Sequence, residues 1–204
     1  MVNTDDSHSE VETETGQESD GGRRAQLVDA AVDHVVAHGI GDLSLRRLGA
    51  AIGVSHRMLI HYFGSKEQLL VEIVRTSERR QRELLSRLRL EPGLSPADVA
   101  RQLWQQLTDP RLAGQERLFF EICGQALRGR PEAVPVLEGL VTDWLEPLVA
   151  AEVDAGAEPA AARNRARLGL ATVRGLLLDL LATGDRAGVD AAMEEFLRLY
   201  YGSE

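Results

Sequence analysis

The sequence predicts an all-α protein of about nine helices, with a short three-helix unit ahead of a larger helical domain. After residue 22, apolar residues recur three and four positions apart along most of the chain, the period of a helix buried on one side. No segment alternates apolar and polar residues as a half-buried strand does. Ala, Leu and Arg are abundant while aromatic residues make up only 4% of the chain, which further favours helix.

The composition indicates an intracellular protein without disulfides. The 204 residues include one cysteine, Cys123, so no disulfide can form within the chain. The sequence has no signal-peptide pattern and no apolar run near ~18 residues, the length that a membrane-spanning helix needs. We therefore expect a soluble, cytoplasmic protein that does not associate with membranes.

Charge is distributed unevenly along the chain. Residues 1–22 contain seven acidic residues and no Lys or Arg, and they lack the large apolar residues that folding requires. We expect a disordered acidic tail over residues 1–22, either a solvated extension or a competitor for a basic surface elsewhere. Residues 23–66 carry six basic and three acidic residues, so this part is locally basic in a chain of net charge −9.

The first helix is predicted from Arg23 to about His38. Gly39 ends it, and its apolar stripe consists of Val28, Val32, Val35 and Val36. Arg23 and Arg24 at its start oppose the helix dipole, so they either contact a phosphate or remain in solvent.

Residues 45–66 have the pattern of a helix-turn-helix. Leu48 and Ile52 stand four apart in one short helix, and Leu59 and Phe63 stand four apart in the next. Gly53 lies between them and can adopt the positive φ of a tight turn. The two helices are therefore expected to cross closely.

Small and hydroxyl residues support this assignment. Gly49 allows close approach of the two helices. Ser44, Ser55 and Ser65 each precede a predicted helix, where a serine side chain can accept a hydrogen bond from the first free backbone N–H groups.

The polar side of the second short helix carries side chains that can bind DNA. In a helix-turn-helix this helix enters the major groove with its N-terminal residues at the base edges. Arg57 can donate two hydrogen bonds to guanine, and His56 and His61 can donate to or accept from bases or phosphates. Met58 and Ile60 offer apolar contact, for example to a thymine methyl group.

Three further side chains are candidates for the DNA backbone. The Ser44 hydroxyl and the free amides of its helix can hold a phosphate, and Arg46 points outward beside them. The Tyr62 hydroxyl either contacts a phosphate or the ring packs inward with its apolar neighbours.

The same stretch resembles the TetR family of bacterial transcriptional regulators. The resemblance covers about residues 23–74 and rests on Leu48-Gly49, Gly53-Val54-Ser55, Tyr62-Phe63, Gly64-Ser65-Lys66-Glu67 and Leu69-Leu70. It implies a helix-turn-helix DNA-binding domain over residues 23–68 and a helical ligand-binding and dimerisation domain over residues 69–204. It also implies that Lys66 clamps a phosphate.

The expected function is that of a ligand-responsive repressor. Such a protein binds a palindromic double-stranded DNA operator as a homodimer and is released by a small-molecule effector. Ile60 stands where the family often has an aromatic residue, so the alternative is a helical interaction module whose degenerate helix-turn-helix no longer binds DNA. The expected DNA-binding residues are Ser44, Arg46, Ser55, His56, Arg57, Met58, Ile60, His61, Tyr62 and Lys66.

Five or six further helices are predicted after the head. Their boundaries follow from Pro, Gly and capping residues at the breaks. The predicted ranges are 65–90, 96–107, 112–127, 132–154, 159–183 and a last helix marked by Val189, Met193, Phe196 and Tyr200.

The helix around residues 168–181 is apolar on nearly all sides. Such a helix is buried on more than one side, so it either contacts a second subunit or is enclosed in a monomer. The family resemblance favours a four-helix dimer interface with the last helix. The expected interface residues are Ala171, Arg174, Gly175, Leu178, Phe196 and Tyr200.

The bulky residues of the second half are candidates for an effector pocket. By resemblance they line an internal cavity, whereas their composition alone is equally that of an ordinary core. The expected lining residues are Trp104, Leu107, Phe119, Phe120, Cys123, Trp144 and Leu177. The sequence spacing places no charged residue in this group, so we expect an apolar or weakly polar effector.

The sequence does not predict an enzyme. All five histidines lie in the tail or the predicted DNA-binding unit, far along the chain from Cys123. No phosphate-binding glycine loop, metal-ligand cluster or cofactor motif is present. We expect neither a metal nor a cofactor.

Overall fold

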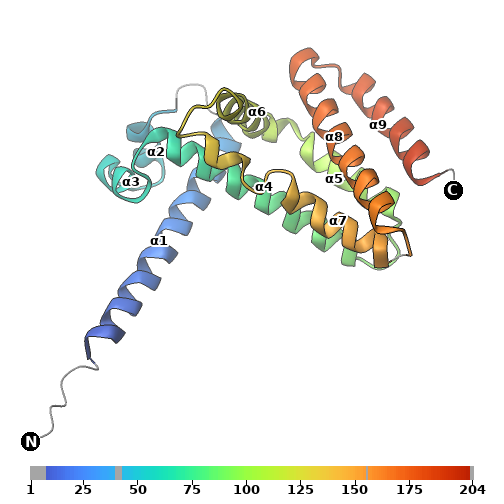
Figure 1. Cartoon of the computed structure of the whole chain (residues 1–204). Helices are drawn as coiled ribbons and strands as arrows, with labels where there is room; N and C mark the ends of the chain where they lie inside the picture. The colour runs from blue at the N-terminus through green and yellow to red at the C-terminus, as the bar shows by residue number, and fades with distance from the viewer. Residues whose placement is uncertain (1–7, 40–42, 155, 203–204) are drawn as a thin grey trace, which may run out of the picture.

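The computed structural model describes residues 8–39, 43–154 and 156–202, and every regular element within them is helical. These residues form nine α-helices, labelled α1 to α9 in Figure 1, and two short 3₁₀ helices, η1 and η2. The predicted all-α class is confirmed. None of the described helices is both long and apolar enough to cross a lipid bilayer.

The head consists of α1 (His8–His38), α2 (Leu45–Ala51), α3 (His56–Phe63) and the first turns of α4 (Lys66–Leu90). The predicted valine stripe of α1 faces its core, and Leu27 and Ala31 extend it. The best-buried side chains of this head core are Ala31, Val32, Val35, Leu48, Leu59, Leu69, Ile73 and Val74.

Three serines begin the helices that follow α1, as predicted. Ser44, Ser55 and Ser65 precede α2, α3 and α4, and each hydroxyl accepts a hydrogen bond of 3.1 or 3.2 Å from the backbone N–H three residues further on. Each bond satisfies a donor that the helix itself leaves free.

The turn between α2 and α3 depends on two glycines. Gly53 has a φ of 75°, a backbone conformation that side chains disfavour. A Cβ atom on Gly49 would lie 2.7 Å from the carbonyl oxygen of Val54, so α2 approaches this turn with no room for a side chain. The predicted close crossing is confirmed.

The body consists of the rest of α4 with α5 (Pro96–Leu107), α6 (Ala113–Leu127), α7 (Thr142–Asp154), α8 (Pro159–Thr183) and α9 (Arg186–Tyr201). The 3₁₀ helix η1 (Pro110–Leu112) lies between α5 and α6. Figure 1 shows α8 and α9 as an antiparallel pair at the end of the molecule far from α3. The core of the body consists of Leu85, Leu88, Val99, Leu103, Trp104, Leu107, Trp144, Leu177, Val189, Met193 and Leu197.

The N-terminal segment differs from its prediction. We expected a disordered tail over residues 1–22, yet α1 begins at His8; residues 1–7 lie outside the described part. The backbone hydrogen bonds of a helix are local, so a helix can form without the buried apolar stripe that the prediction required. Figure 1 shows this part of α1 projecting away from the head, which explains why no apolar stripe marks it in the sequence.

The region before α7 also differs from its prediction. We predicted one helix over residues 132–154, but a short 3₁₀ helix, η2 (Val134–Leu137), precedes an irregular segment and α7 begins only at Thr142. Pro135 has no N–H to donate within a helix, and Gly139 has a φ of 71°. Both residues prevent a continuous helix.

The head and the body touch at a pair of glycines. Gly114, on α6, packs against the residue that ends α1: a Cβ atom on Gly114 would lie 3.0 Å from the Cα of Gly39 and 3.7 Å from the carbonyl oxygen of Val35. The contact is therefore between two backbones.

The contact at Gly114 predicts that a glycine-to-alanine substitution changes the free energy of unfolding in opposite directions at two positions of α6. Gly124→Ala has only a flexible arginine end near its Cβ, so it should raise the free energy of unfolding by about 0.5–1 kcal/mol. Gly114→Ala should instead lower it by about 1 kcal/mol, because the new methyl group presses on α1. Urea denaturation of both variants measures the difference. Equal stabilisation by the two substitutions would contradict a backbone contact at Gly114.

Candidate functional site

One face of α3 is solvent-exposed and polar. His56, Arg57, Ile60 and His61 are exposed, and their spacing puts them in adjacent rows on one side of the helix. The opposite side is fixed in the head core, where Leu59 is 0% exposed. Burial of Leu59 in the head core therefore fixes the orientation of the exposed residues on the other side of α3.

Arg24 of α1 contacts the C-terminal end of α3. Its Nε donates to the carbonyl oxygen of Tyr62 at 3.4 Å, and its Nη1 lies 3.2 Å from the Glu72 carboxylate of α4. Its guanidinium group also lies 5.2 Å from the centre of the Phe63 ring. We considered Arg24 a phosphate contact or a solvated residue, but in the structure it joins three helices of the head.

The remaining predicted DNA-binding residues divide into two groups. Ser44 and Arg46 are exposed at the start of α2, Ser55 is exposed at the start of α3, and Lys66 is half-buried at the start of α4. Met58 and Tyr62 are half-buried and pack against the head core, which is the inward alternative considered for Tyr62. A hydrogen bond to the Asp20 carboxylate raises the pKa of the Tyr62 hydroxyl.

Ion pairs increase the positive character of the head. Arg80 of α4 binds Asp29 at 2.9 Å and Asp33 at 2.7 Å, both on α1. These are two of the three acidic residues between positions 23 and 66. Arg80 compensates the negative charge of these two aspartates, so they offset little of the positive charge of the basic residues on α2 and α3.

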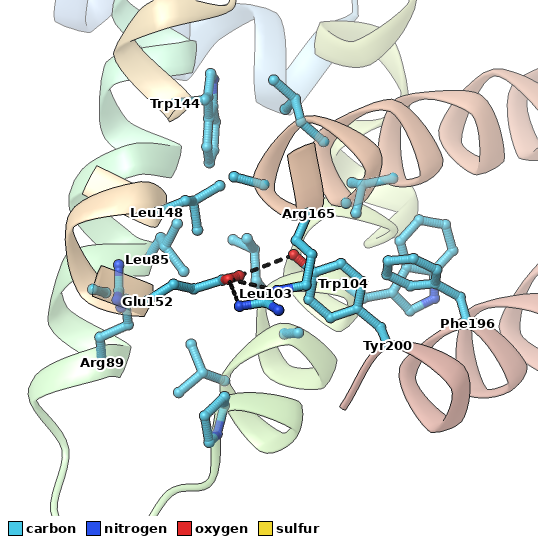
Figure 2. A pocket seen from close by; sticks show the side chains of 18 of the residues that line it. Leu85, Arg89, Leu103, Trp104, Trp144, Leu148, Glu152, Arg165, Phe196 and Tyr200 are labelled. Carbon is cyan, nitrogen blue, oxygen red and sulfur yellow. Dashed lines mark hydrogen bonds and ion pairs between the residues drawn. The ribbon is translucent and has the colours of Figure 1, made fainter. Parts of the chain in front are cut away.

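The body encloses a second candidate site, a cavity of about 770 Å³. Side chains from α4 to α9 line it, and Figure 2 shows Trp104, Trp144 and Leu148 around it with Phe196 and Tyr200 of α9 on one side. Five of the seven predicted lining residues are present: Trp104, Leu107, Phe119, Trp144 and Leu177.

Phe120 and Cys123 do not line the cavity. Both pack against the head core from α6, and Phe120 also packs against the core of the body. Burial raises the pKa of the Cys123 thiol to about 11, so it remains protonated at neutral pH and is a poor nucleophile.

Charged side chains also line the cavity, which corrects the premise of an uncharged pocket. Glu78 of α4 accepts hydrogen bonds from Trp144 Nε1 at 2.8 Å and from Arg174 Nη2 at 3.0 Å. Glu116 of α6 accepts one from Gln81 Nε2 at 2.7 Å. These residues are separated by up to 96 positions in the chain, so sequence spacing gave no signal that they meet.

A third carboxylate lies near the end of α9. Glu152 accepts hydrogen bonds from Arg165 Nε at 2.7 Å and from the Tyr200 hydroxyl at 3.2 Å, as the dashed lines in Figure 2 show. Burial raises the pKa of the Tyr200 hydroxyl, so this group remains a hydrogen-bond donor at neutral pH.

The predicted dimer residues fall on two sides of the body. Ala171, Gly175 and Leu178 are exposed on the outer face of α8. The other three, Arg174, Phe196 and Tyr200, line the cavity instead. Because α8 is apolar on nearly all sides, its sequence does not distinguish the side that lines the cavity from the exposed side.

Known sequences are similar to the head of this chain. Residues 27–73 match the family model described as bacterial regulatory proteins, tetR family. The chain is 43% identical over 54 residues to the HTH-type transcriptional regulator BetI of Agrobacterium fabrum, and 31% identical over 81 residues to BetI of Stenotrophomonas maltophilia. These matches cover 26% and 40% of this chain and 26% and 41% of the relatives, so the chain spans less than half of their length.

Solved structures share the fold over most of the chain. A transcriptional regulator from Rhodococcus sp. Rha1 has a TM-score of 0.64 and 23% identity over 87% of this chain and 95% of its own. The multidrug binding protein EbrR, crystallised with imidazole, has a TM-score of 0.55 and 27% identity over 87% of this chain and 89% of its own. The similarity thus includes the body as well as the head.

The position of Glu116 predicts a pH-dependent change in stability. Burial and the nearby Glu78 carboxylate raise the pKa of Glu116 from 4.5 to about 7. Ionisation of Glu116 therefore destabilises the folded chain progressively as the pH rises from about 4.5 to about 7. Glu116→Gln removes this effect, so the variant should exceed the wild type in free energy of unfolding by roughly 3 kcal/mol at pH 8 but by less than about 1 kcal/mol at pH 5.

Denaturation at both pH values tests this prediction. Glu121→Gln, an exposed substitution on the same helix, is the matched control and should follow the wild type at each pH. A Glu116→Gln advantage of the same size at pH 5 and pH 8 would show that ionisation of Glu116 is not its cause.

Proposed function

The chain belongs to the TetR family, and we propose that it is a DNA-binding transcriptional regulator that responds to a small molecule. The observation that carries the proposal is the exposed His56, Arg57 and His61 row of α3, held in place by buried Leu59 and Phe63. It lies within the residues that match the family model. Division into a DNA-binding domain over residues 23–68 and an effector domain over residues 69–204 belongs to the same proposal.

On this proposal, α3 enters the major groove. Arg57 donates to a guanine edge and the two histidines contact neighbouring bases or phosphates. Ser44, Arg46 and Lys66 flank α3 at the starts of α2 and α4, where they contact the DNA backbone. Ile60 is exposed between the polar residues and offers an apolar contact to a thymine methyl group.

The outer face of α8 supports a homodimer. Leu168, Ala171, Gly175 and Leu178 recur at intervals of three and four residues and are all exposed, the two leucines by 57% and 52%. Small residues in such a row permit close approach of a second α8. Two-fold symmetry then gives a pair of α3 helices for two half-sites about 34 Å apart, which calls for a palindromic operator.

The cavity supports a small-molecule effector. Its volume of about 770 Å³ and its mixture of aromatic and polar walls are those of a small-molecule site. EbrR, which shares this fold, is a multidrug binding protein crystallised with imidazole.

Two helices connect the cavity with the head. α4 begins at Lys66 and reaches Glu78 twelve residues later, about 18 Å along the helix. α6 carries Glu116 two residues from Gly114, the residue that packs on α1. An effector that favours one arrangement of these helices shifts the population of DNA-competent dimers.

Arg57→Ala tests DNA recognition by α3. The variant should bind a duplex from the region upstream of its own gene at least about ten-fold more weakly, since a bidentate guanine contact contributes about 1–3 kcal/mol. Arg87→Ala removes an exposed arginine from the body end of α4 and should bind like the wild type. Fluorescence anisotropy against a scrambled duplex measures both. If Arg57→Ala and Arg87→Ala bind alike, α3 does not read this DNA.

Leu178→Glu tests the dimer. A charge at the centre of the α8 face should convert the dimer to a monomer in light scattering, because an unpaired charge is costly to bury. Leu90→Glu, at a leucine 83% exposed at the end of α4, should remain dimeric. A dimeric Leu178→Glu variant would place the interface elsewhere.

A further inference from the structure

Most acidic side chains that line the cavity have a partner that compensates their charge. Glu78 binds Arg174, and Glu152 binds Arg165. Glu158 is the N-cap of α8, where its carboxylate accepts a backbone N–H hydrogen bond at the positive end of the helix. These three carboxylates are therefore already engaged by groups of the protein itself.

Glu116 is the exception among the described residues. It is 4% exposed, and its hydrogen-bond partners are the neutral side-chain amides of Gln81 and Gln115. The nearest guanidinium, that of Arg174, already binds Glu78 and the carbonyl oxygen of Leu140. A buried carboxylate without a cation is costly, and a bound cation compensates that cost.

The remaining basic side chain of the lining does not supply this cation. Arg89 donates to the carbonyl oxygen of Pro147 at 2.9 Å. It lies eight residues beyond Gln81 on α4, about 12 Å along the helix.

Aromatic rings line the same cavity as Glu116. The indole N–H groups of Trp104 and Trp144 donate to Asp190 at 2.7 Å and to Glu78 at 2.8 Å, which fixes both rings at the wall. Phe119 already has the Arg174 guanidinium 5.2 Å from its ring centre. Such rings attract cations and also bury apolar groups.

We infer that the cavity selects an organic cation: a small, largely apolar molecule with one protonated amine that binds the Glu116 carboxylate. Its apolar part lies against Trp104, Trp144 and Phe119. The inference rests on the proposed role of the cavity as the effector site, and it assigns to that site a positively charged ligand class rather than the uncharged one expected from the sequence.

A panel of matched compounds tests the charge preference. Benzylamine, 1-naphthylmethylamine and 9-anthracenylmethylamine are each compared with the alcohol and the carboxylic acid of the same ring system. Calorimetric titration should show that the wild type binds the best amine at least about ten-fold more tightly than its alcohol, the range of a charge-assisted hydrogen bond. The carboxylic acid should bind most weakly.

Two variants assign the preference to Glu116. Glu116→Gln should reduce the amine-to-alcohol ratio to about one, whereas Glu116→Asp, which keeps the charge, should retain a preference for the amine. Glu121→Gln, exposed on α6, should bind all compounds and DNA like the wild type. Circular dichroism of each variant verifies that it is folded.

Three results would overturn the inference: equal binding of amines and alcohols, no binding of any amine, or a preference that survives in Glu116→Gln. DNA binding by the same wild-type preparation separates this failure from that of the proposed function. A protein that binds its upstream duplex without an amine preference retains the regulator role but not the cationic effector. An amine preference in a protein that does not bind DNA supports the cation site and contradicts the regulator role.

Discussion

The arrangement of the body depends on one buried carboxylate, Glu78. It joins three helices, because it lies on α4 and accepts hydrogen bonds from Trp144 of α7 and Arg174 of α8. A buried ion pair that loses one partner costs several kcal/mol, so these helices cannot separate without a large penalty. The same bonds hold an indole ring and a guanidinium group at the cavity wall. The shape of the cavity and the packing of the helices are therefore set by the same interaction.

The head is fixed to the body along α4 in a comparable way. Arg24 and Arg80 connect α1 with α4, the first through Glu72 and the second through two aspartates of α1. Arg24 also donates a hydrogen bond to the carbonyl oxygen of Tyr62 at the end of α3. Single pairs that are partly exposed contribute little stability, but those on α1 and α4 all constrain the same two helices. They orient the exposed row of α3 relative to α4 more than they stabilise the head.

The sequence predicted what depends on neighbours in the chain. Helix boundaries, the serine caps and the turn at Gly53 follow from residues within four positions of one another. Pro135 and Gly139 carry an equally local signal against a helix over residues 132–154, and in the structure they outweigh the apolar period of that segment. Contacts such as Glu78 with Arg174 join distant positions, so a single sequence could not place Glu116 in the cavity or distinguish the inner from the outer face of α8.

The position of Glu116 on α6 gives the cavity a direct mechanical connection to the head. Gly114, two residues earlier, touches the end of α1 backbone to backbone, while Leu118 and Ile122 of α6 share the head core with the valines of α1. Close-packed contacts of this kind transmit small displacements instead of damping them. A ligand that draws Glu116 toward the cavity must therefore either move α1 or open the contact at Gly39. Since α1 carries Arg24, and Arg24 contacts α3, either change reaches the exposed row of α3 through contacts present in the structure.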